Sequence, residues 1–173
     1  MYEFYVGTTP KDPPGNIVKV CLDSDGQLVD KSYYEAVSPA YLCRKGSCIY
    51  AVIENADFGG VQVFDVNKNG SLTAKARLDT EDVYSTYISA EKRGNRIFVA
   101  NYGTPSCAVY RYEAEKLVQE SVLREKKTEK SHIHCAALTP EEAYVCLCNY
   151  RKQFRGVFDG LYTGAGKKAR NFR

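Results

Sequence analysis

One sequence pattern recurs along the chain at intervals of about 46 residues, and this repeat constrains the fold more than any other feature. The pattern appears in SPAYLC, in YSTYIS and in SHIHCA, so that Tyr41, Tyr87 and His134 take equivalent places, 46 and 47 residues apart. Val63 and Val109 are also 46 residues apart. A fixed period of this length indicates that one supersecondary unit is used several times.

Each repeat unit consists of short strand-like runs separated by turns. The runs CIYAVIE and RIFVANY are rich in β-branched and aromatic residues. In VQVFDV and AVYRY the residues alternate, which suggests strands with one face toward the core and one face outward. DSDGQL and NKNGSL contain Asp25-Gly26 and Asn69-Gly70, which predict hairpin turns. We find no convincing helical pattern, and LVQESVL fits a strand. The sequence therefore predicts an all-β fold, a β-propeller of four-stranded antiparallel blades.

Charge and composition narrow the function classes. Residues 151–173 contain 7 Lys and Arg and one Asp, a charge of +6, which leaves −3 for residues 1–150. A nucleic-acid-binding protein needs a basic face on its folded body, so we expect no nucleic-acid partner. No apolar run is long enough for a membrane span and the first residues do not read as a secretory signal, so we expect a cytoplasmic protein without a membrane partner. The seven cysteines are expected to be reduced core thiols.

Several motifs occur in an order and spacing that resemble a known family. They are YVGTT at 5–9, SPAYLC and YAVIEN within 38–55, FVANYG at 98–103 and SHIHCAALTPEEAYVCLCNY at 131–150. Together they resemble the lactonase family of seven-bladed β-propellers, which contains propeller-type 6-phosphogluconolactonases and carboxymuconate-lactonising enzymes. The resemblance implies a small-molecule lactone as substrate and no cofactor.

Residues 151–173 depart from the family pattern. Composition changes at Arg151, and GLYTGAGKKARNFR does not resemble a blade. We therefore expect a truncated or frame-shifted chain that holds about three to four of the seven blades. Residues 1–159 would form this partial propeller, and residues 160–173 a basic, disordered tail. The exposed blade faces and sheet edges of such a partial ring favour self-association.

The resemblance assigns His134 to a catalytic or substrate-binding position in the central pocket. A neutral imidazole takes and returns a proton near neutral pH, so His134 is the candidate base for attack of water on a lactone carbonyl. His132 is a candidate substrate-binding neighbour, because both histidines share one face of an extended strand. Glu54, Asn101 and Asn149 end equivalent strands and are further substrate-binding candidates, with turn capping as the structural alternative.

A zinc site is a second interpretation of the two histidines, since together with Cys146 and Cys148 they form a legitimate ligand set. Strand register decides between the interpretations. A two- or four-residue turn centred on Pro140-Glu141 pairs His134 with Leu147 and directs both cysteines to the other face of the sheet. The segment LTPEEA favours the four-residue turn, so we expect no metal.

The sequence leaves two functions open. The first is a lactone hydrolase of sugar metabolism, acting on 6-phosphogluconolactone. In the family, later blades supply an arginine and a glutamate to the site, so a chain without those blades is expected to be nearly inactive. The second is a non-catalytic partial propeller, a remnant or an interaction module, because a fold alone does not fix a function.

Overall fold

A computed structural model describes residues 1–9, 15–124, 131–151 and 154–162. These residues form fourteen strands, and no helix that could cross a membrane is found among them. The strands are β1 (Tyr2–Gly7), β2 (Asn16–Leu22), β3 (Leu28–Glu35), β4 (Leu42–Lys45), β5 (Cys48–Val52), β6 (Gly59–Val66), β7 (Leu72–Thr80), β8 (Ser85–Ala90), β9 (Arg96–Asn101), β10 (Ser106–Glu113), β11 (Lys116–Arg124), β12 (Ile133–Leu138), β13 (Val145–Arg151) and β14 (Phe154–Tyr162).

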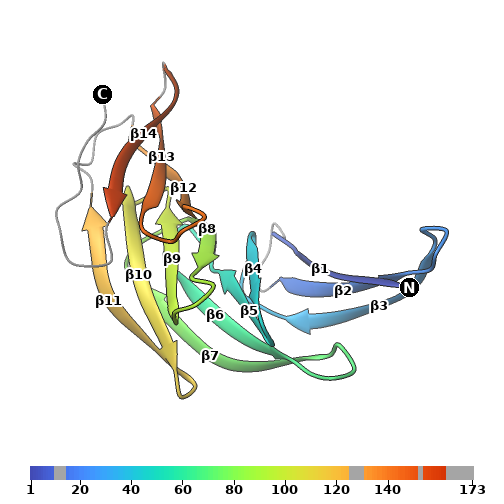
Figure 1. Ribbon diagram of the computed structural model, residues 1–173. Coiled ribbons are helices and arrows are strands. Elements are labelled where there is room, and N and C mark those ends of the chain that lie inside the picture. The colour runs from blue at the N-terminus through green and yellow to red at the C-terminus, as the bar shows by residue number, and fades with distance from the viewer. Residues whose placement is uncertain (10–14, 125–130, 152–153, 163–173) are drawn as a thin grey trace.

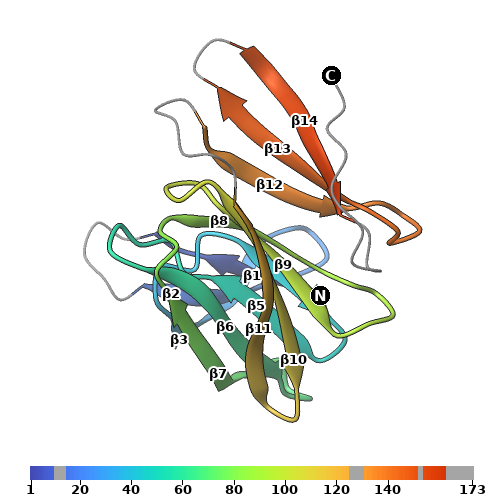
Figure 2. The same ribbon diagram turned by 90° about the vertical axis from the view of Figure 1, so that its left-hand side faces the viewer.

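The strands form four antiparallel sheets that follow one another along an open arc (Figure 1). The two central sheets, β4–β7 and β8–β11, have four strands each. In the described part of the chain the first sheet, β1–β3, and the last, β12–β14, have three (Figure 2). The predicted all-β partial propeller is confirmed, and the expected four strands per blade are found in the central sheets. Strand β14 continues to Tyr162, and most of the predicted tail, residues 163–173, lies outside the described residues.

The two predicted hairpin turns are confirmed, and they have the same construction. The turn Asp23–Gln27 joins β2 to β3, and Asn67–Ser71 joins β6 to β7. In each, the amide of the first residue donates to the carbonyl of the last, at 3.0 and 2.8 Å. Gly26 and Gly70 adopt φ angles of +79° and +76°, which glycine reaches without steric cost. The repeated sequence pattern therefore marks a repeated backbone turn.

Apolar side chains fill the space between each sheet and the next. The cluster between the two central sheets is buried almost completely, and it comprises Tyr50, Val52, Val61, Val63, Ile88, Ile97, Val99, Ala108 and Tyr110. Similar clusters join the first sheet to the second and the third to the fourth. Because the central sheets bury both faces, β5 and β9 are almost continuous apolar runs rather than alternating ones.

Strands β8 and β12 carry a β-bulge at the same place. In β8 the pairing register shifts across Thr86, and in β12 it shifts across His134. Each of these residues is therefore the extra one of its bulge. Counted from the bulges, His134 is equivalent to Thr86, so the equivalence with Tyr87 that the spacing predicts is wrong by one residue. Spacing alone cannot detect an inserted residue that the partner strand does not match.

The register of β12 and β13 also differs from the prediction. Leu147 pairs with Ala136 rather than with His134. The connecting turn encloses four residues, as predicted, because Thr139 N donates to Tyr144 O at 3.0 Å. Its centre lies one residue later than Pro140-Glu141, and this displacement moves every pair by two positions.

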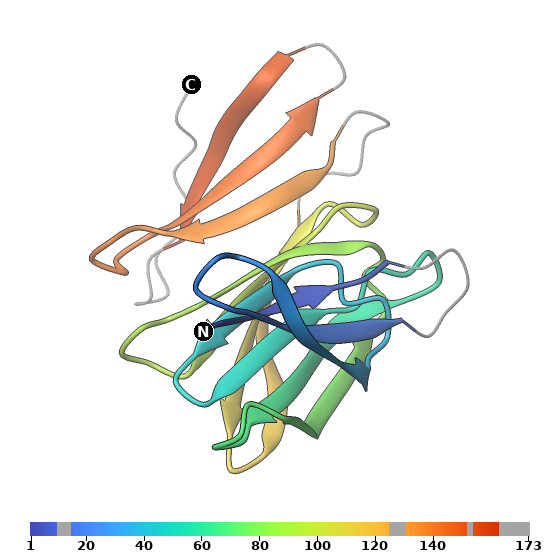
Figure 3. The same cartoon turned by 90° about the vertical axis from the view of Figure 1, so that its right-hand side faces the viewer.

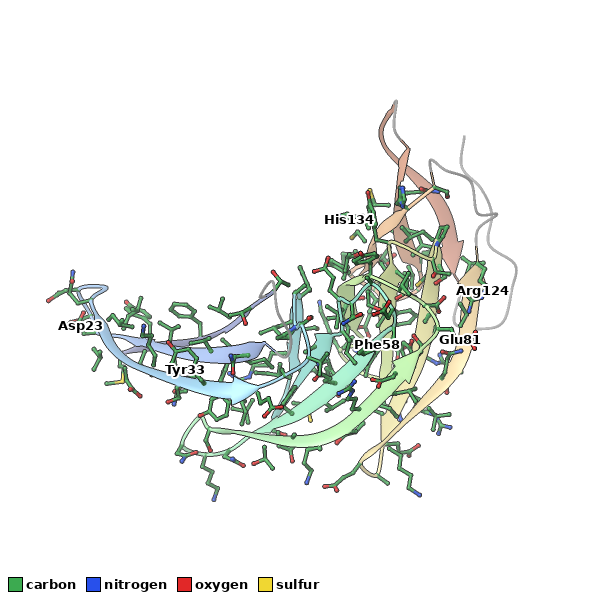
Figure 4. All side chains as sticks on the ribbon, turned by 180° about the vertical axis from the view of Figure 1, so that it is seen from behind. Asp23, Tyr33, Phe58, Glu81, Arg124 and His134 are labelled. Atoms are coloured by element: carbon green, nitrogen blue, oxygen red, sulfur yellow. The ribbon has the colours of Figure 1, made fainter. Side chains whose placement is uncertain are left out.

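The first sheet leaves one of its faces open. Ile17, Lys19 and Cys21 of β2 are buried against the second sheet, whereas alternate residues point away from it. On that outer face Tyr2, Phe4, Val6 and Tyr33 are 63%, 42%, 43% and 61% exposed. No other described element covers the face (Figure 3), and Figure 4 marks Tyr33 on this sheet. A contiguous apolar sheet face of this kind favours association.

We expect the chain to self-associate through this open face. The double substitution Phe4→Lys/Tyr33→Lys places two charges on the face and should shift gel-filtration elution toward the monomer. Val118→Lys is the matched control, because Val118 is 47% exposed on β11, outside the face. An unsubstituted chain that elutes as a monomer at every concentration would contradict the expectation.

Substitutions at Gly60 and Gly26 distinguish the effect of backbone strain from that of steric overlap. Both have positive φ angles, +139° and +79°, but a Cβ at Gly60 would lie 2.0 Å from the carbonyl oxygen of Leu78, whereas one at Gly26 meets nothing within 4 Å. Gly26→Ala should therefore cost about 1 kcal/mol from backbone strain alone. Gly60→Ala should cost about 3 kcal/mol or more, because steric overlap adds to the strain. Urea denaturation measures both, and equal losses would contradict the assignment.

Candidate functional site

An open hollow of about 600 Å³ lies where the inner strands of the second, third and fourth sheets approach one another. The residues that line it are Glu54, Tyr84, Thr86, Tyr102 and His134. They come from the end of β5, the start of β8, the end of β9 and the strand β12. Figure 4 marks His134 on β12. Two of the predicted site residues, Glu54 and His134, thus meet although 80 residues separate them in the sequence.

A repeated backbone contact sets the positions of Glu54 and Tyr102. The amide of Glu54 donates to the carbonyl of Ser38 at 3.0 Å, and the amide of Tyr102 donates to the carbonyl of Tyr84 at 2.8 Å. Ser38 and Tyr84 both adopt left-handed backbone angles, with φ of 39° and 51°. The same device therefore brings Glu54 and Tyr102 to corresponding places on the rim of the hollow.

Burial perturbs the carboxyl group of Glu54. Loss of solvent around the side chain raises the pKa of Glu54 above its ordinary value of 4.5, and the nearby charge of His134 partly opposes this rise. Glu54 therefore keeps its proton to a higher pH than an exposed glutamate. The opposing effect of His134 also means that the two groups interact electrically across the hollow.

Tyr102 lies between the two histidines. Its ring stacks on that of His132, with centroids 4.1 Å apart and an interplanar angle of 9°. Its ring is perpendicular to that of His134, at 5.8 Å and 89°. Nδ1 of His132 lies 3.0 Å from the carbonyl oxygen of Tyr102, and the backbone amide of His132 donates to Asn149 Oδ1 at 2.9 Å. His132 lies behind Tyr102 and does not line the hollow.

Asn101 and Asn149 are buried side chains that hydrogen-bond to serine residues. Asn101 is fully buried. It accepts a hydrogen bond from the Ser85 hydroxyl at 2.7 Å and donates one to the Ser106 hydroxyl at 2.9 Å. Asn149 is 2% exposed, and its Nδ2 donates to the Ser131 hydroxyl at 3.0 Å. Neither asparagine lines the hollow. The structure therefore brings only two of the five predicted site residues to its surface.

The two cysteines of β13 do not join His134 in the hollow. Cys148 pairs with Cys135, Cys146 pairs with Ala137, and neither β13 cysteine lines the hollow. All seven cysteines are free thiols. Within the described ranges, no three or more His, Cys, Asp or Glu side chains are grouped so that they could hold a metal ion.

Sequence reasoning missed three residues of the hollow, namely Tyr84, Thr86 and Tyr102. Tyr102 directly follows Asn101 in the FVANYG motif, so the motif marks the correct strand end, one residue early. Thr86 lies between Ser85 and Ile88, which are three positions apart in the sequence and both buried. This burial pattern follows from the bulge at Thr86, which the sequence alone does not reveal.

The four sheets form part of a β-propeller. The hollow lies beside the inner strands of its blades and contains two ionisable side chains, Glu54 and His134. Residues 3–151 match the family described as "Lactonase, 7-bladed beta-propeller". The chain therefore belongs to the lactonase family of seven-bladed β-propellers, as the motifs predict.

Individual relatives agree with this assignment. The chain is 28% identical to a 6-phosphogluconolactonase of Bacillus subtilis over 94% of its own length and 48% of that protein. A crystal structure of a candidate 6-phosphogluconolactonase from Bacteroides fragilis has a TM-score of 0.76 and 22% identity, over 96% of this chain and 51% of that one. The periplasmic gluconolactonase of Pseudomonas aeruginosa also has a TM-score of 0.76, with 19% identity, over 98% and 53%. The chain spans about half the length of these relatives.

The raised pKa of Glu54 makes a prediction about stability. The folded state binds the Glu54 proton more tightly than the unfolded state, so ionisation of this group disfavours folding as pH rises above about 4.5. Glu54→Gln removes the ionisable group and should raise the melting temperature at pH 7. Well below pH 4.5, where Glu54 is protonated in both states, the substitution should have little effect on stability. Thermal unfolding over this pH range tests it, and a loss of stability at pH 7 would contradict it.

Proposed function

We propose that the hollow is a lactone-binding site of a sugar-lactone hydrolase, with 6-phosphogluconolactone as the favoured substrate. The observation that carries the proposal is the meeting of His134 and Glu54 in one hollow with two tyrosine rings. His134 supplies a proton acceptor, Glu54 a carboxyl group that can hydrogen-bond a sugar, and the tyrosines flat ring surfaces, all of which suit a cyclic sugar ester.

Each side chain has a role in the proposed reaction. His134 accepts a proton from water, and the resulting hydroxide attacks the lactone carbonyl. The bond between the carbonyl carbon and the ring oxygen then breaks, and the proton passes to that oxygen. Glu54 holds hydroxyl groups of the sugar by hydrogen bonds. Tyr84 and Tyr102 offer ring faces to the less polar side of the substrate.

The same hollow limits the expected rate. None of its five lining residues is lysine or arginine, so no permanent cation among them stabilises the oxyanion of the tetrahedral intermediate. Loss of one oxyanion donor alone costs about a hundred- to a thousand-fold in rate. The hollow is also open to bulk water. We therefore expect this chain by itself to bind the ligand but to hydrolyse it at close to the uncatalysed rate.

Similar proteins support the choice of substrate class. The Bacillus subtilis relative is named for 6-phosphogluconolactone, and the Pseudomonas aeruginosa structure is named for gluconolactone. We therefore propose a role in carbohydrate metabolism, within the pentose phosphate pathway if the substrate is phosphorylated. We also propose a cytoplasmic location, which the free-thiol state of the seven cysteines supports.

The test combines binding with hydrolysis. We expect 6-phosphogluconate, the stable product, to shift the imidazole signals of His134 in an NMR titration. We expect His134→Ala to weaken this binding, while hydrolysis of 6-phosphogluconolactone stays near background for both chains. Efficient hydrolysis that His134→Ala abolishes would support the site and refute the expected low rate. Neither binding nor hydrolysis would refute the proposal.

A non-catalytic interaction module is the second candidate function. The open apolar face of the first sheet favours it, because such faces mark interaction sites in soluble proteins. A chain that self-associates through this face and binds no sugar lactone would agree with this candidate and not with the first.

A further inference from the structure

We propose that His132 is a positioning residue, which acts through Tyr102 to orient the ring of His134 in the hollow and does not itself contact the ligand. The functional meaning of this inference rests on the proposed function, whereas its geometry rests on contacts among three side chains. It gives His132 a different role from the substrate-binding one that the sequence predicts.

His132 is held at three points. Its backbone amide donates to Asn149 Oδ1 at 2.9 Å, and its Nδ1 lies 3.0 Å from the carbonyl oxygen of Tyr102. A carbonyl oxygen only accepts hydrogen bonds, so Nδ1 carries a hydrogen in this contact. The third point is the flat stack on Tyr102, at 4.1 Å and 9°. The backbone and the ring of His132 are therefore both fixed relative to Tyr102.

Tyr102 transmits this constraint to the hollow. One contact of its ring is the stack on His132, and another is the perpendicular contact with His134, at 5.8 Å and 89°. Stacked and perpendicular arrangements are both preferred by aromatic rings. The ring of Tyr102 also lines the hollow, so any rotation of this ring would move a wall of the site and the neighbour of His134 together.

His134 needs such a support because of its place in the backbone. It is the extra residue of the β12 bulge, unmatched by the partner strand, and its side chain is exposed. An exposed side chain on a bulge has few neighbours that restrict its rotation. A catalytic group displaced by 1 Å can lose about a hundred-fold in rate, so a base at this place requires a neighbour that fixes it. Tyr102 is an aromatic ring in contact with it.

Direct contact of His132 with the ligand is the competing interpretation. His132 does not line the hollow, and its ring stacks against Tyr102, which does. Its Nδ1 is also engaged by the carbonyl of Tyr102. These contacts favour a supporting role over a binding one.

The chain contains only two histidines, which makes the test unusually direct. Imidazole NMR signals of the whole chain come from His132 and His134 alone, and any His132 variant leaves only those of His134. His132→Phe keeps a flat ring for the stack and removes the Nδ1 hydrogen, whereas His132→Ala removes both. His132→Leu is a second variant without a ring, and Tyr33→Phe, on the distant first sheet, is the control.

We expect a nuclear Overhauser effect between the ring protons of His134 and Tyr102 in the unsubstituted chain, in the control and in His132→Phe. We expect it to be lost in His132→Ala and His132→Leu. Affinity for 6-phosphogluconate should fall about tenfold in those two variants, as for one lost oriented contact, and change by less than about twofold in His132→Phe.

Two results would overturn the inference. One is an unchanged Overhauser effect in both variants that lack the ring. The other is an equal loss of affinity in His132→Phe and His132→Ala while the contact between Tyr102 and His134 persists, because His132 would then touch the ligand. If the unsubstituted chain binds no 6-phosphogluconate but its Overhauser effects follow the expected pattern, the positioning role stands and the proposed function fails.

Discussion

Burial of apolar side chains between successive sheets is the constraint on which the other features of this protein depend. The two central sheets bury both faces, and each fully buried valine or isoleucine contributes about 1.5–3 kcal/mol relative to exposure. To fill these spaces the sheets must stack face to face, and stacking brings the inner strands of neighbouring sheets together. Glu54 and His134 approach each other for this reason and not through any contact local in sequence. The hollow is thus a consequence of the packing between blades.

The bulges of β8 and β12 allow these strands to pack in the core and also to place one side chain each in the hollow. Ile133 and Ala136 are both buried against the third sheet although an uninterrupted strand would direct them to opposite faces. The extra residue of the bulge lies between them and turns both side chains to the same face of the sheet. That extra residue is His134, and it lines the hollow. Thr86 has the same relation to its own strand. The packing of the core and the presentation of a polar side chain therefore come from one local irregularity.

At the ends of β5 and β9, one residue is buried in the core and the residue that follows it lines the hollow. Ile53 and Asn101 occupy corresponding positions and are both fully buried. The next residue in each segment, Glu54 or Tyr102, lines the hollow, because successive side chains of an extended chain point to opposite sides. Asn101 hydrogen-bonds to the hydroxyl of Ser85 in the neighbouring strand β8, and Asn149 to that of Ser131, just before β12, which satisfies polar groups whose burial would otherwise be costly. Tyr102, the residue after Asn101, lines the hollow.

The sequence by itself determined the class of fold, the two glycine turns and two of the residues that line the hollow, Glu54 and His134. These depend on local periodicity and on residues such as Gly26 and Gly70, whose conformational preferences act over a few positions. Tertiary structure alone decided which side chain at each strand end enters the hollow. A shift of one residue reverses the direction of a side chain, and neither the bulge at His134 nor the turn that sets the β12–β13 register leaves a clear mark in the spacing. The choice between Asn101 and Tyr102 is made by contacts between strands that are distant in sequence.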